Sequence, residues 1–396
     1  MTGETSVSLC RPLSIRGRTL KNRLVISPMC QHAAEDGFVT DWHIVHYGKF
    51  VLGGAALILT ESTAVAEDSR VGIDDLGIWK DEHIPGMKRL ADFAHGNGAL
   101  MGVQLAHSGR KAFSEPLWEG GNAMRPEEIE RYGIPWRRVG PSAIAASPEW
   151  SVPTSLSVEQ IQEIREQHVS AARRADAANM DVLELHYGHG YLVASFLSPK
   201  ANVRSDAYGG SLENRMRIAI EIAKGVREVW PAEKPLFVRL SCVDGTVDGW
   251  SLNDTLVLAG RLKDVGVDVI DCSSGGLSEE TRRSNVPRGF GFQVPFARCV
   301  REEADILTQA VGLITTPEQA EEIVASGSAD LVAIGREALR NPYWPAEAER
   351  QLTGGEEYRA WPVRHRAWLD KREPVMRRLM DEARGTSQNE GNEGGQ

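Results

Sequence analysis

Three residues that can exchange protons or hydrogen bonds lie close together in the sequence: His186, His189 and Tyr191. Two imidazoles and a phenol at this spacing can donate hydrogen bonds to a substrate oxygen and supply a proton. The H-x-x-H spacing can also hold a metal if a third ligand, such as His107 or Glu184, completes the site. A buried histidine pair bonded to the backbone is the structural alternative. No recognised metal motif surrounds the pair, so the sequence favours hydrogen-bond donors.

A second group of candidates, Gly312, Gly335 and Arg336, is suited to binding a phosphate. After the last two strands of an α/β barrel, backbone amides and a helix N-terminus commonly bind phosphate, and an arginine can add a bidentate contact. The sequence has neither a strand-turn-helix G-x-G-x-x-G nor a G-x-x-x-x-G-K-[ST] motif. Any nucleotide-type cofactor is therefore expected in the mouth of a barrel.

Arg239 ends a run of mostly apolar residues and is expected to be buried. A buried guanidinium is costly unless it pairs with an anion or faces a ligand. An ion pair with Glu61 or Glu184 and contact with a bound ligand are equally compatible with the residues themselves.

The elements that must position these groups are short apolar runs alternating with amphipathic segments. Such runs suit strands buried on both faces. Helix-like stretches lie between them, for example 211–229 and 158–179, where Ser157 and Gln160 form a capping box. Repeated alternation of this kind implies a parallel sheet, and eight units favour a closed barrel. We therefore predict an α/β fold, a single (β/α)8 TIM barrel, with strands at 24–27, 56–60, 100–106, 182–186, 236–241, 267–272, 306–311 and 331–335.

We expect residues 1–384 to form this barrel as one domain. The connection 107–154 is rich in Gly, Pro, Trp and charge, and long loops in compact domains are usually functional. It is expected to pass over the barrel mouth as an excursion after strand 3 and to roof part of the pocket; a neutral surface insertion is the alternative. Residues 385–396 are too polar to pack and are expected to be disordered.

Composition narrows the function classes. The formal net charge of −10 argues against nucleic acid or an anionic membrane as the partner, since both need a basic face. The five cysteines share no C-x-x-C spacing and are odd in number, which predicts free thiols in a reducing compartment. Neither a signal peptide nor an apolar stretch long enough to span a membrane is evident, so a cytoplasmic enzyme is expected.

Together these motifs resemble the old yellow enzyme family of NADH:flavin oxidoreductases, and within it the thermophilic-like subclass. Each segment alone is a weak signal, whereas their order and spacing together are specific. The resemblance covers nearly the whole chain. The segments that carry it are 22–30, 104–111, 186–191, 196–199, 204–215, 237–239, 272–275 and 334–337.

The resemblance implies FMN as the cofactor and NADPH or NADH as its reductant. Cys30, which marks the subclass, would lie near the isoalloxazine edge and tune the flavin potential. Ser62 and Gln104 would bind the pyrimidine edge, and Arg239 would favour the anionic reduced flavin at N1 and the C2 carbonyl. The residues implied in FMN binding are Ser27, Pro28, Cys30, Ser62, Gln104, Arg239, Ser274, Gly275, Gly312, Gly335 and Arg336.

The resemblance also implies an ene-reductase reaction. His186 and His189 would bind the carbonyl or nitro oxygen of an activated alkene, and Tyr191 would protonate its α-carbon after hydride reaches the β-carbon. Lys111 would lie near the pocket entrance. His32 stands where the subclass often has tyrosine, and it is expected to bind substrate.

Other expectations concern assembly and the direction of the reaction. The family implies a homo-oligomer, a dimer or tetramer, with Arg364 or Arg366 reaching a neighbouring site. A flavin-dependent desaturase, running the reaction in reverse with oxygen as acceptor, would use the same pocket. Amine dehydrogenase and dienoyl-CoA reductase relatives carry a cysteine cluster and an extra dinucleotide domain, for which this sequence offers no counterpart. A metal-dependent hydrolase and a non-catalytic flavin-binding protein are the remaining alternatives.

Overall fold

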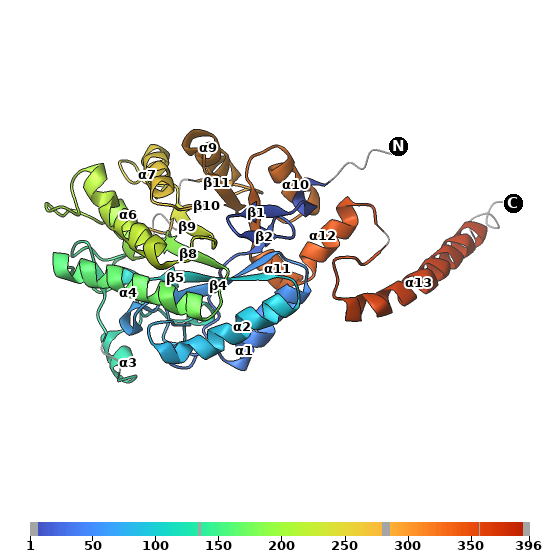
Figure 1. Ribbon diagram of the computed structural model, residues 1–396, viewed down its shortest axis with the longest axis horizontal. Helices are drawn as coiled ribbons and strands as arrows, with labels where there is room; N and C mark the ends of the chain where they lie inside the picture. The colour runs from blue at the N-terminus through green and yellow to red at the C-terminus, as the bar shows by residue number, and fades with distance from the viewer. Residues whose placement is uncertain (1–6, 134–135, 279–285, 356, 391–396) are drawn as a thin grey trace.

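The short apolar runs of the sequence form the parallel strands of a closed barrel (Figure 1). The computed structural model describes residues 7–133, 136–278, 286–355 and 357–390, with side chains described as far as residue 384. The strands follow one another in chain order, and β12 closes the barrel against β3. The predicted (β/α)8 TIM barrel is therefore confirmed. Its strands are β3 (Leu24–Ile26), β4 (Leu57–Ala64), β5 (Leu100–Ala106), β8 (Val182–Tyr187), β9 (Leu236–Ser241), β10 (Val269–Ser273), β11 (Leu307–Val311) and β12 (Leu331–Ile334).

Each of the eight predicted runs overlaps a barrel strand, and the second differs most from its prediction. β4 continues to Ala64, well past the predicted end at residue 60. Its register against β5 shifts between Leu59 and Ser62. An irregularity of this kind changes the direction of the side chains that follow it. As a result Ser62 pairs with Gln104, so two residues predicted to bind the cofactor lie side by side.

Helices cover the outside of the barrel, and α4 begins where the capping box predicts (Figure 1). The amide of Gln160 donates to Ser157 Oγ at 3.3 Å, and the amide of Ser157 donates to Gln160 Oε1 at 2.9 Å. These bonds satisfy amides that a helix start would otherwise leave unpaired. The α-helices are α1 (Asp41–Leu52), α2 (Ile84–Gly96), α3 (Pro126–Glu130), α4 (Val158–Ala177), α5 (Leu192–Leu197), α6 (Leu212–Val229), α7 (Leu252–Asp264), α9 (Val294–Ala304), α10 (Pro317–Ala325), α11 (Arg336–Arg340), α12 (Trp344–Leu352) and α13 (Val363–Glu390). Shorter elements are the 3-10 turns η1 (Ser8–Cys10), η2 (Glu67–Ser69), η3 (Asp81–His83), η4 (Gly109–Lys111) and η5 (Leu117–Glu119), the hairpin β1 (Leu13–Ile15) and β2 (Arg18–Leu20), and the pair β6 (Val139–Gly140) and β7 (Thr154–Ser155).

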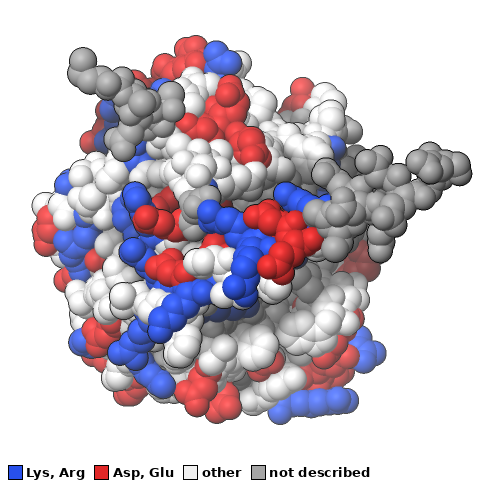
Figure 2. Space-filling view, turned by 90° about the vertical axis from the view of Figure 1, so that its right-hand side faces the viewer, with Lys and Arg blue, Asp and Glu red and all other residues white. Residues whose placement is uncertain are grey.

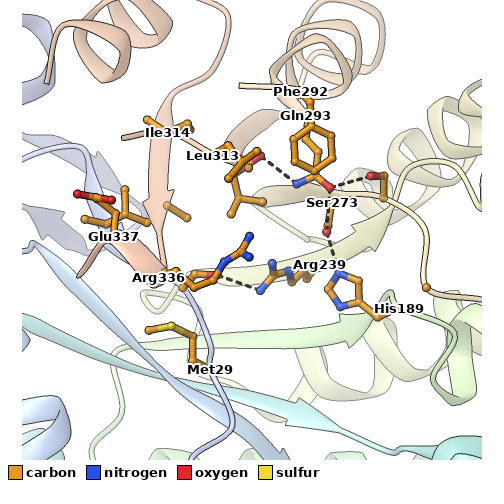
Figure 3. Close-up of a pocket in the computed structure, with 18 of the residues that line it drawn as sticks. Met29, His189, Arg239, Ser273, Phe292, Gln293, Leu313, Ile314, Arg336 and Glu337 are labelled. Atoms are coloured by element: carbon orange, nitrogen blue, oxygen red, sulfur yellow. Dashed lines mark hydrogen bonds between the residues drawn. The ribbon is translucent and has the colours of Figure 1, made fainter. Parts of the chain in front are cut away.

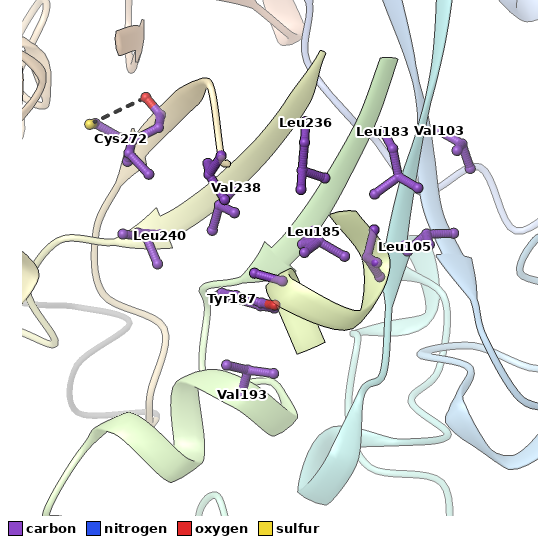
Figure 4. Close-up of a cluster of buried hydrophobic side chains, with 14 of the residues drawn as sticks. Val103, Leu105, Leu183, Leu185, Tyr187, Val193, Leu236, Val238, Leu240 and Cys272 are labelled. Carbon is purple, nitrogen blue, oxygen red and sulfur yellow. Dashed lines mark hydrogen bonds between the residues drawn. The ribbon is translucent and has the colours of Figure 1, made fainter. Parts of the chain in front are cut away.

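The largest apolar core lies between the strands and the helices (Figure 4). Alternate residues of β8, namely Leu183, Leu185 and Tyr187, belong to this outer core. The Tyr187 hydroxyl donates to the carbonyl of Ala219 in α6 at 3.0 Å, which satisfies its polar end. Truncating a buried leucine typically costs about 2–5 kcal/mol, so this core fixes the strands that carry the inward-facing residues.

The interior of the barrel is layered along its axis, because successive side chains of a strand point to opposite faces. At the N-terminal end lies an apolar layer, closed by Ile15 and Leu20 of the β1–β2 hairpin. Its other buried members are Val25, Ala56, Leu57, Leu59, Val182, Phe237, Val269, Leu331 and Ala333. Two residues further along the strands come polar side chains that we call the polar layer: Gln104, Glu184, Arg239, Asp271 and Gln309. The C-terminal ends of the strands follow directly after it.

The excursion between β5 and α4 has a small apolar cluster of its own. Ala112, Phe113, Met124 and Ile129 are buried against one another. The buried Arg138 donates to the carbonyls of Ala112, Phe113 and Met124 at 2.8, 3.0 and 2.8 Å. One guanidinium therefore binds several backbone carbonyls that would otherwise be buried without partners.

The C-terminal helix α13 projects away from the barrel (Figure 1). It continues to Glu390, so residues 385–390 are helical where the sequence predicts disorder; residues 391–396 lie outside the described part. Once a helix has formed, each further residue adds a hydrogen bond, which lets polar residues extend it. On this side of the molecule Lys and Arg are mixed with Asp and Glu and do not form a single basic face (Figure 2). Within the described ranges, no helix is both long and apolar enough to cross a bilayer.

Candidate active site

A cavity of about 630 Å³ opens at the C-terminal end of the barrel (Figure 3). It receives residues from the ends of several strands, as barrel architecture dictates for catalytic sites. Because the C-terminal ends of all the strands meet at this end of the barrel, residues that are far apart in the sequence lie together here. The predicted site residues that line it are Ser27, Lys111, His189, Tyr191, Arg239, Ser274, Gly312, Gly335 and Arg336.

The other predicted residues do not line this cavity, although contacts connect some of them to its lining. His186 packs against His189 and Tyr191, with ring centroids 5.1 Å from each. The carbonyl of Gly275 accepts a hydrogen bond from Ser241 Oγ at 2.8 Å. The residues of this second set are Pro28, Cys30, His32, Ser62, Gln104, His186 and Gly275.

The region after β11 and β12 has the form of a phosphate cradle. Gly312 has a φ of +123°, and a Cβ there would lie 3.0 Å from the ring of Phe292. Gly335 is the N-cap of α11, and Arg336, its first residue, lines the same cavity (Figure 3). The first amides of a helix have no partner within the helix and can bind an anion. Backbone that leaves room, free amides and a guanidinium together fit the phosphate end of FMN.

Gln293 is a site residue that sequence reasoning missed. Its Nε2 donates to the carbonyl of Val311 at 3.0 Å, while its Oε1 accepts from Ser274 Oγ at 2.7 Å. Ser273 Oγ also lies 3.4 Å from that Oε1. Gln293 therefore links the loop after β10 to the end of β11. Its only sequence signal is its place directly before helix α9, which is too common to be specific.

Arg239 has a different ion-pair partner from either one considered in the sequence. Its Nε lies 3.2 Å from Asp271 Oδ2, and its Nη1 donates to Ser27 Oγ at 3.1 Å. Glu184 instead accepts from Gln104 Nε2 at 2.7 Å, and Glu61 accepts from the amide of Gln31 at 2.8 Å. The alternatives of Glu61 and Glu184 are thus corrected to Asp271, because β10 lies in register beside β9 and places this carboxyl opposite Arg239. Arg239 also lines the cavity, so its guanidinium lies between the Asp271 carboxyl and the proposed ligand site.

His186 and His189 present two nitrogens to each other, with 3.4 Å between Nε2 of His186 and Nδ1 of His189. The amide of Gly188 lies 3.4 Å from His186 Nδ1 and donates to it, which leaves the hydrogen of a neutral ring on Nε2. His189 Nε2 lies 2.7 Å from Ser273 Oγ. When the Ser273 hydroxyl donates to this nitrogen, His189 carries its hydrogen on Nδ1. Both facing nitrogens are then donors.

The surroundings of the two histidines keep them neutral. Burial, followed by the charges of Arg239 and Lys111, lowers the pKa of His189 to about 3. Burial, followed by His189, Arg239 and Lys111, lowers the pKa of His186 well below its usual range. Neutral imidazoles can donate hydrogen bonds near neutral pH without protonating a substrate.

Tyr191 lies at the start of α5, beside the histidine pair. Burial, and then the charges of Cys30 and Asp75, raise the pKa of its phenol. The phenol thus keeps its proton near neutral pH. The ammonium of Lys111 lies 5.9 Å from the Tyr191 ring and donates to the carbonyl of His189 at 2.9 Å and to that of Gly276. Lys111 therefore joins the loops after β8 and β10 at the cavity.

His32 is held in an acidic environment by Asp75. Its φ is +50°, a conformation that few residues other than glycine adopt, and its Nδ1 lies 3.2 Å from Asp75 Oδ1. The other oxygen of Asp75 accepts from the amides of Val71 and Gly72 at 3.0 and 2.8 Å. Burial lowers the pKa of His32, but the close contact with Asp75 and that residue's charge outweigh burial, and the net pKa is raised. Trp118 of η5 packs edge-on against the ring at 5.7 Å.

The surroundings of the Cys30 thiol favour its protonated form. Burial, followed by the charges of Asp75 and Glu61, raises its pKa well above the usual range. Glu61 accepts from the amide of Gln31 and so fixes the loop that carries Cys30.

Two further predictions concern residues outside this cavity. Among the described residues, no group of three or more His, Cys, Asp and Glu side chains is arranged to hold a metal ion. Arg364 and Arg366 lie in the first turn of α13, and neither lines the cavity. Which of the two reaches a neighbouring subunit stays a prediction.

Comparisons with known proteins identify a family of flavin-dependent oxidoreductases. The family model described as NADH:flavin oxidoreductase / NADH oxidase matches residues 8–354. An NADPH dehydrogenase of Geobacillus sp. (strain WCH70) is 44% identical over 346 residues, which cover 87% of this chain and 94% of that protein. Morphinone reductase in complex with tetrahydroNAD has a TM-score of 0.70 at 26% identity, covering 87% of this chain and 90% of that one. 2-Naphthoyl-CoA reductase has a TM-score of 0.78 at 25% identity over 88% of this chain, which spans about half, 52%, of that longer protein.

Proposed function

Because this chain belongs to the NADH:flavin oxidoreductase / NADH oxidase family, the old yellow enzyme family, we propose that it reduces the C=C bond of α,β-unsaturated carbonyl compounds or related activated alkenes. It is an FMN-dependent oxidoreductase that uses NAD(P)H. The observation that carries the proposal is the pair of neutral histidines whose nitrogens face each other beside the cofactor cradle. Such a pair can polarise one substrate oxygen.

The lining of the cavity, together with Ser62 and Gln104 outside it, suits FMN along its length. The glycines and Arg336 would hold the phosphate, Ser274 the ribityl chain, and Ser62, Gln104 and Arg239 the pyrimidine edge. Bound FMN supplies hydride, which it accepts from NAD(P)H and passes to the substrate. Gln104 Nε2 donates to Glu184, so its oxygen is left to accept from a ligand N–H.

The substrate oxygen would lie between His186 and His189 in this proposal. Each imidazole donates one hydrogen bond, and both strengthen as negative charge develops on that oxygen. A well-placed donor of this kind is typically worth about 3 kcal/mol in the transition state. Ser273 would position His189 by donating to its Nε2, and Gln293 holds the same loop by accepting from the neighbouring Ser274 Oγ.

Tyr191 is the proposed proton donor. It lines the same cavity as His189, and its ring centroid lies 5.1 Å from that of His186. Because burial raises the pKa of the phenol, it holds its proton until a strongly basic carbon forms beside it. The carbon that becomes basic in such a reduction is the one next to the polarised carbonyl.

An absorption spectrum of the purified protein, followed by anaerobic addition of NADPH and then cyclohexenone, tests the proposal. We expect a flavin band that bleaches with NADPH and returns with the enone. Repeating the first step with NADH identifies the preferred reductant. Reoxidation by oxygen alone, with no effect of enone, would favour the desaturase. A protein that stays colourless after reconstitution with FMN would contradict the cofactor assignment.

A further inference from the structure

The polar layer inside the barrel holds more ionisable groups than a structural role needs. Gln104, Glu184, Arg239, Asp271 and Gln309 lie on five consecutive strands and are at most 7% exposed. Gln104 is in register with Glu184, and Asp271 is in register with both Arg239 and Gln309. These are two sets of neighbours, and the charges of Asp271 and Arg239 act on Glu184 across the interior.

This layer is closed from below and meets the cavity from above. Phe237 and Val269 of the apolar layer precede Arg239 and Asp271 by two residues on the same strands. On the other side, Arg239 lines the cavity where FMN is proposed to bind. Any change in charge at the cofactor is therefore felt by the carboxyls through Arg239.

Much of the hydrogen-bonding capacity of this layer is unused. Glu184 Oε2 and both carboxyl oxygens of Asp271 are buried without a hydrogen-bond partner among the described residues, as are both ends of the Gln309 amide. The ion pair of Arg239 Nε with Asp271 Oδ2, at 3.2 Å, lacks the geometry of a hydrogen bond. Buried polar atoms usually have a hydrogen-bond partner, and those without one often belong to functional groups.

The layer also has one carboxyl more than it has cations. With both carboxyls ionised, two negative charges face the single positive charge of Arg239 in a space closed to water. Unpaired buried charge is costly, so the group is expected to retain a proton. The groups nearest above, His186 and His189, are neutral, and the cavity beyond them is also lined by the cations Lys111, Arg288 and Arg336.

The pKa values of Glu184 and Asp271 are both raised, as expected for two carboxyls that face a single cation. Burial, and next the charge of Asp271, raise the pKa of Glu184 to about 8, against the opposing effect of Arg239. Burial likewise raises the pKa of Asp271. Since the two carboxyls interact, the proton belongs to the pair and to neither residue alone.

We propose that Glu184 and Asp271 share one proton while the flavin is oxidised and take up a second from water when the flavin becomes reduced and anionic beside Arg239. This inference rests on the proposed function, because it needs FMN in the cavity. Reduction brings two electrons and one proton to the flavin, and the extra proton neutralises the second carboxylate. No bond of the protein is oxidised or reduced, and the extra proton leaves when the flavin is reoxidised.

The experiment is a measurement of the flavin midpoint potential against pH on the holoenzyme. Two protons per two electrons double the slope expected for a single proton. We expect the doubled slope around neutral pH in the wild type, and the single-proton slope in Glu184→Gln and Asp271→Asn. Asp181→Asn is the matched control, a buried carboxyl at the closed end of the barrel, and should keep the doubled slope.

A single-proton slope in the wild type, or a doubled slope retained by both variants, would overturn the inference. If the variants do not fold, redox-difference infrared spectroscopy of the wild type decides, since reduction must increase the signal of protonated carboxyl groups. An unchanged carboxyl signal would also overturn it. A protein that binds no FMN fails the proposed function instead, so the two failures are distinguishable.

Discussion

Two buried carboxyls, one just before β8 and one in the middle of that strand, meet opposite conditions. Asp181, just before the strand, accepts from Arg18 at 2.9 Å, from His95 at 2.6 Å and from the amide of Met101 at 3.0 Å. Glu184, inside the barrel, accepts from Gln104 and leaves one oxygen without a hydrogen-bond partner among the described residues. At the closed end polar groups are satisfied by the protein and serve stability. Towards the open end they are left for a ligand, a proton or a substrate.

The strongest way to test this division is to remove the donors at the open end. Replacing both His186 and His189 by alanine should lower enone turnover by at least about 100-fold, because a single oxyanion donor is typically worth that much. FMN should stay bound, since neither side chain is assigned to it. Stopped-flow reoxidation of the reduced enzyme measures the loss. Retained enone reduction would remove the pair from its assigned role.

At the closed end the same kind of change should affect stability. Asp181→Asn leaves buried donors without their charged acceptor, which we expect to lower the free energy of unfolding by about 1–3 kcal/mol. Denaturant unfolding measures this, and the rate of enone reduction per bound FMN should be unchanged. A large loss of turnover with normal stability would contradict the comparison.

The phosphate cradle should show an intermediate effect. Arg336→Ala should weaken FMN binding roughly tenfold, since a charge-assisted contact is worth about 1.5–3 kcal/mol and the backbone amides remain. Titration of apoprotein with FMN, followed by flavin fluorescence, gives the affinity. Arg340→Ala is the control, because Arg340 lies on the same short helix and pairs with Glu337. Equal affinity in the Arg336 variant and the wild type would contradict the phosphate assignment.

The smallest effect is expected at the pair of His32 and Asp75. The folded pKa of His32 is raised, so protonated His32 stabilises the fold fully below its unfolded pKa of about 6.5 and progressively less as pH rises through the folded value. The stability difference between wild type and His32→Gln should therefore shrink from pH 6 to pH 9, by about 0.2–1 kcal/mol. A difference that is constant with pH would show that His32 is not charged in the folded state.

The strand ends could be predicted from the sequence, whereas the contacts between strands could not. His189, Tyr191 and the glycines were found because the C-terminal ends of parallel strands must meet at one edge of the barrel. Asp271 was not singled out as a site residue, because it lies within a mostly apolar run that is typical of a buried strand. Its pairing with Arg239 depends on the register of β9 and β10, which no local pattern contains.

Other differences have similar physical causes. The bulge that sets Ser62 beside Gln104 arises between two strands and has no signature in either one. Gln293 acts through a loop whose path depends on the whole barrel mouth. The polar residues after 384 were predicted to be disordered from composition alone, although a preceding helix can continue into such a segment.

The self-contained core of the excursion after β5 has a consequence for the evolution of this enzyme. Its apolar cluster and the three carbonyls bound by Arg138 lie within the excursion itself. A segment that supplies much of its own packing, with Ile73 as a contact outside it, can be lengthened, shortened or exchanged among relatives while the barrel strands stay the same. The range of substrates can then change while the catalytic residues on the barrel stay the same. Laboratory recombination can exchange the segment at the same points, the end of β5 and the start of α4.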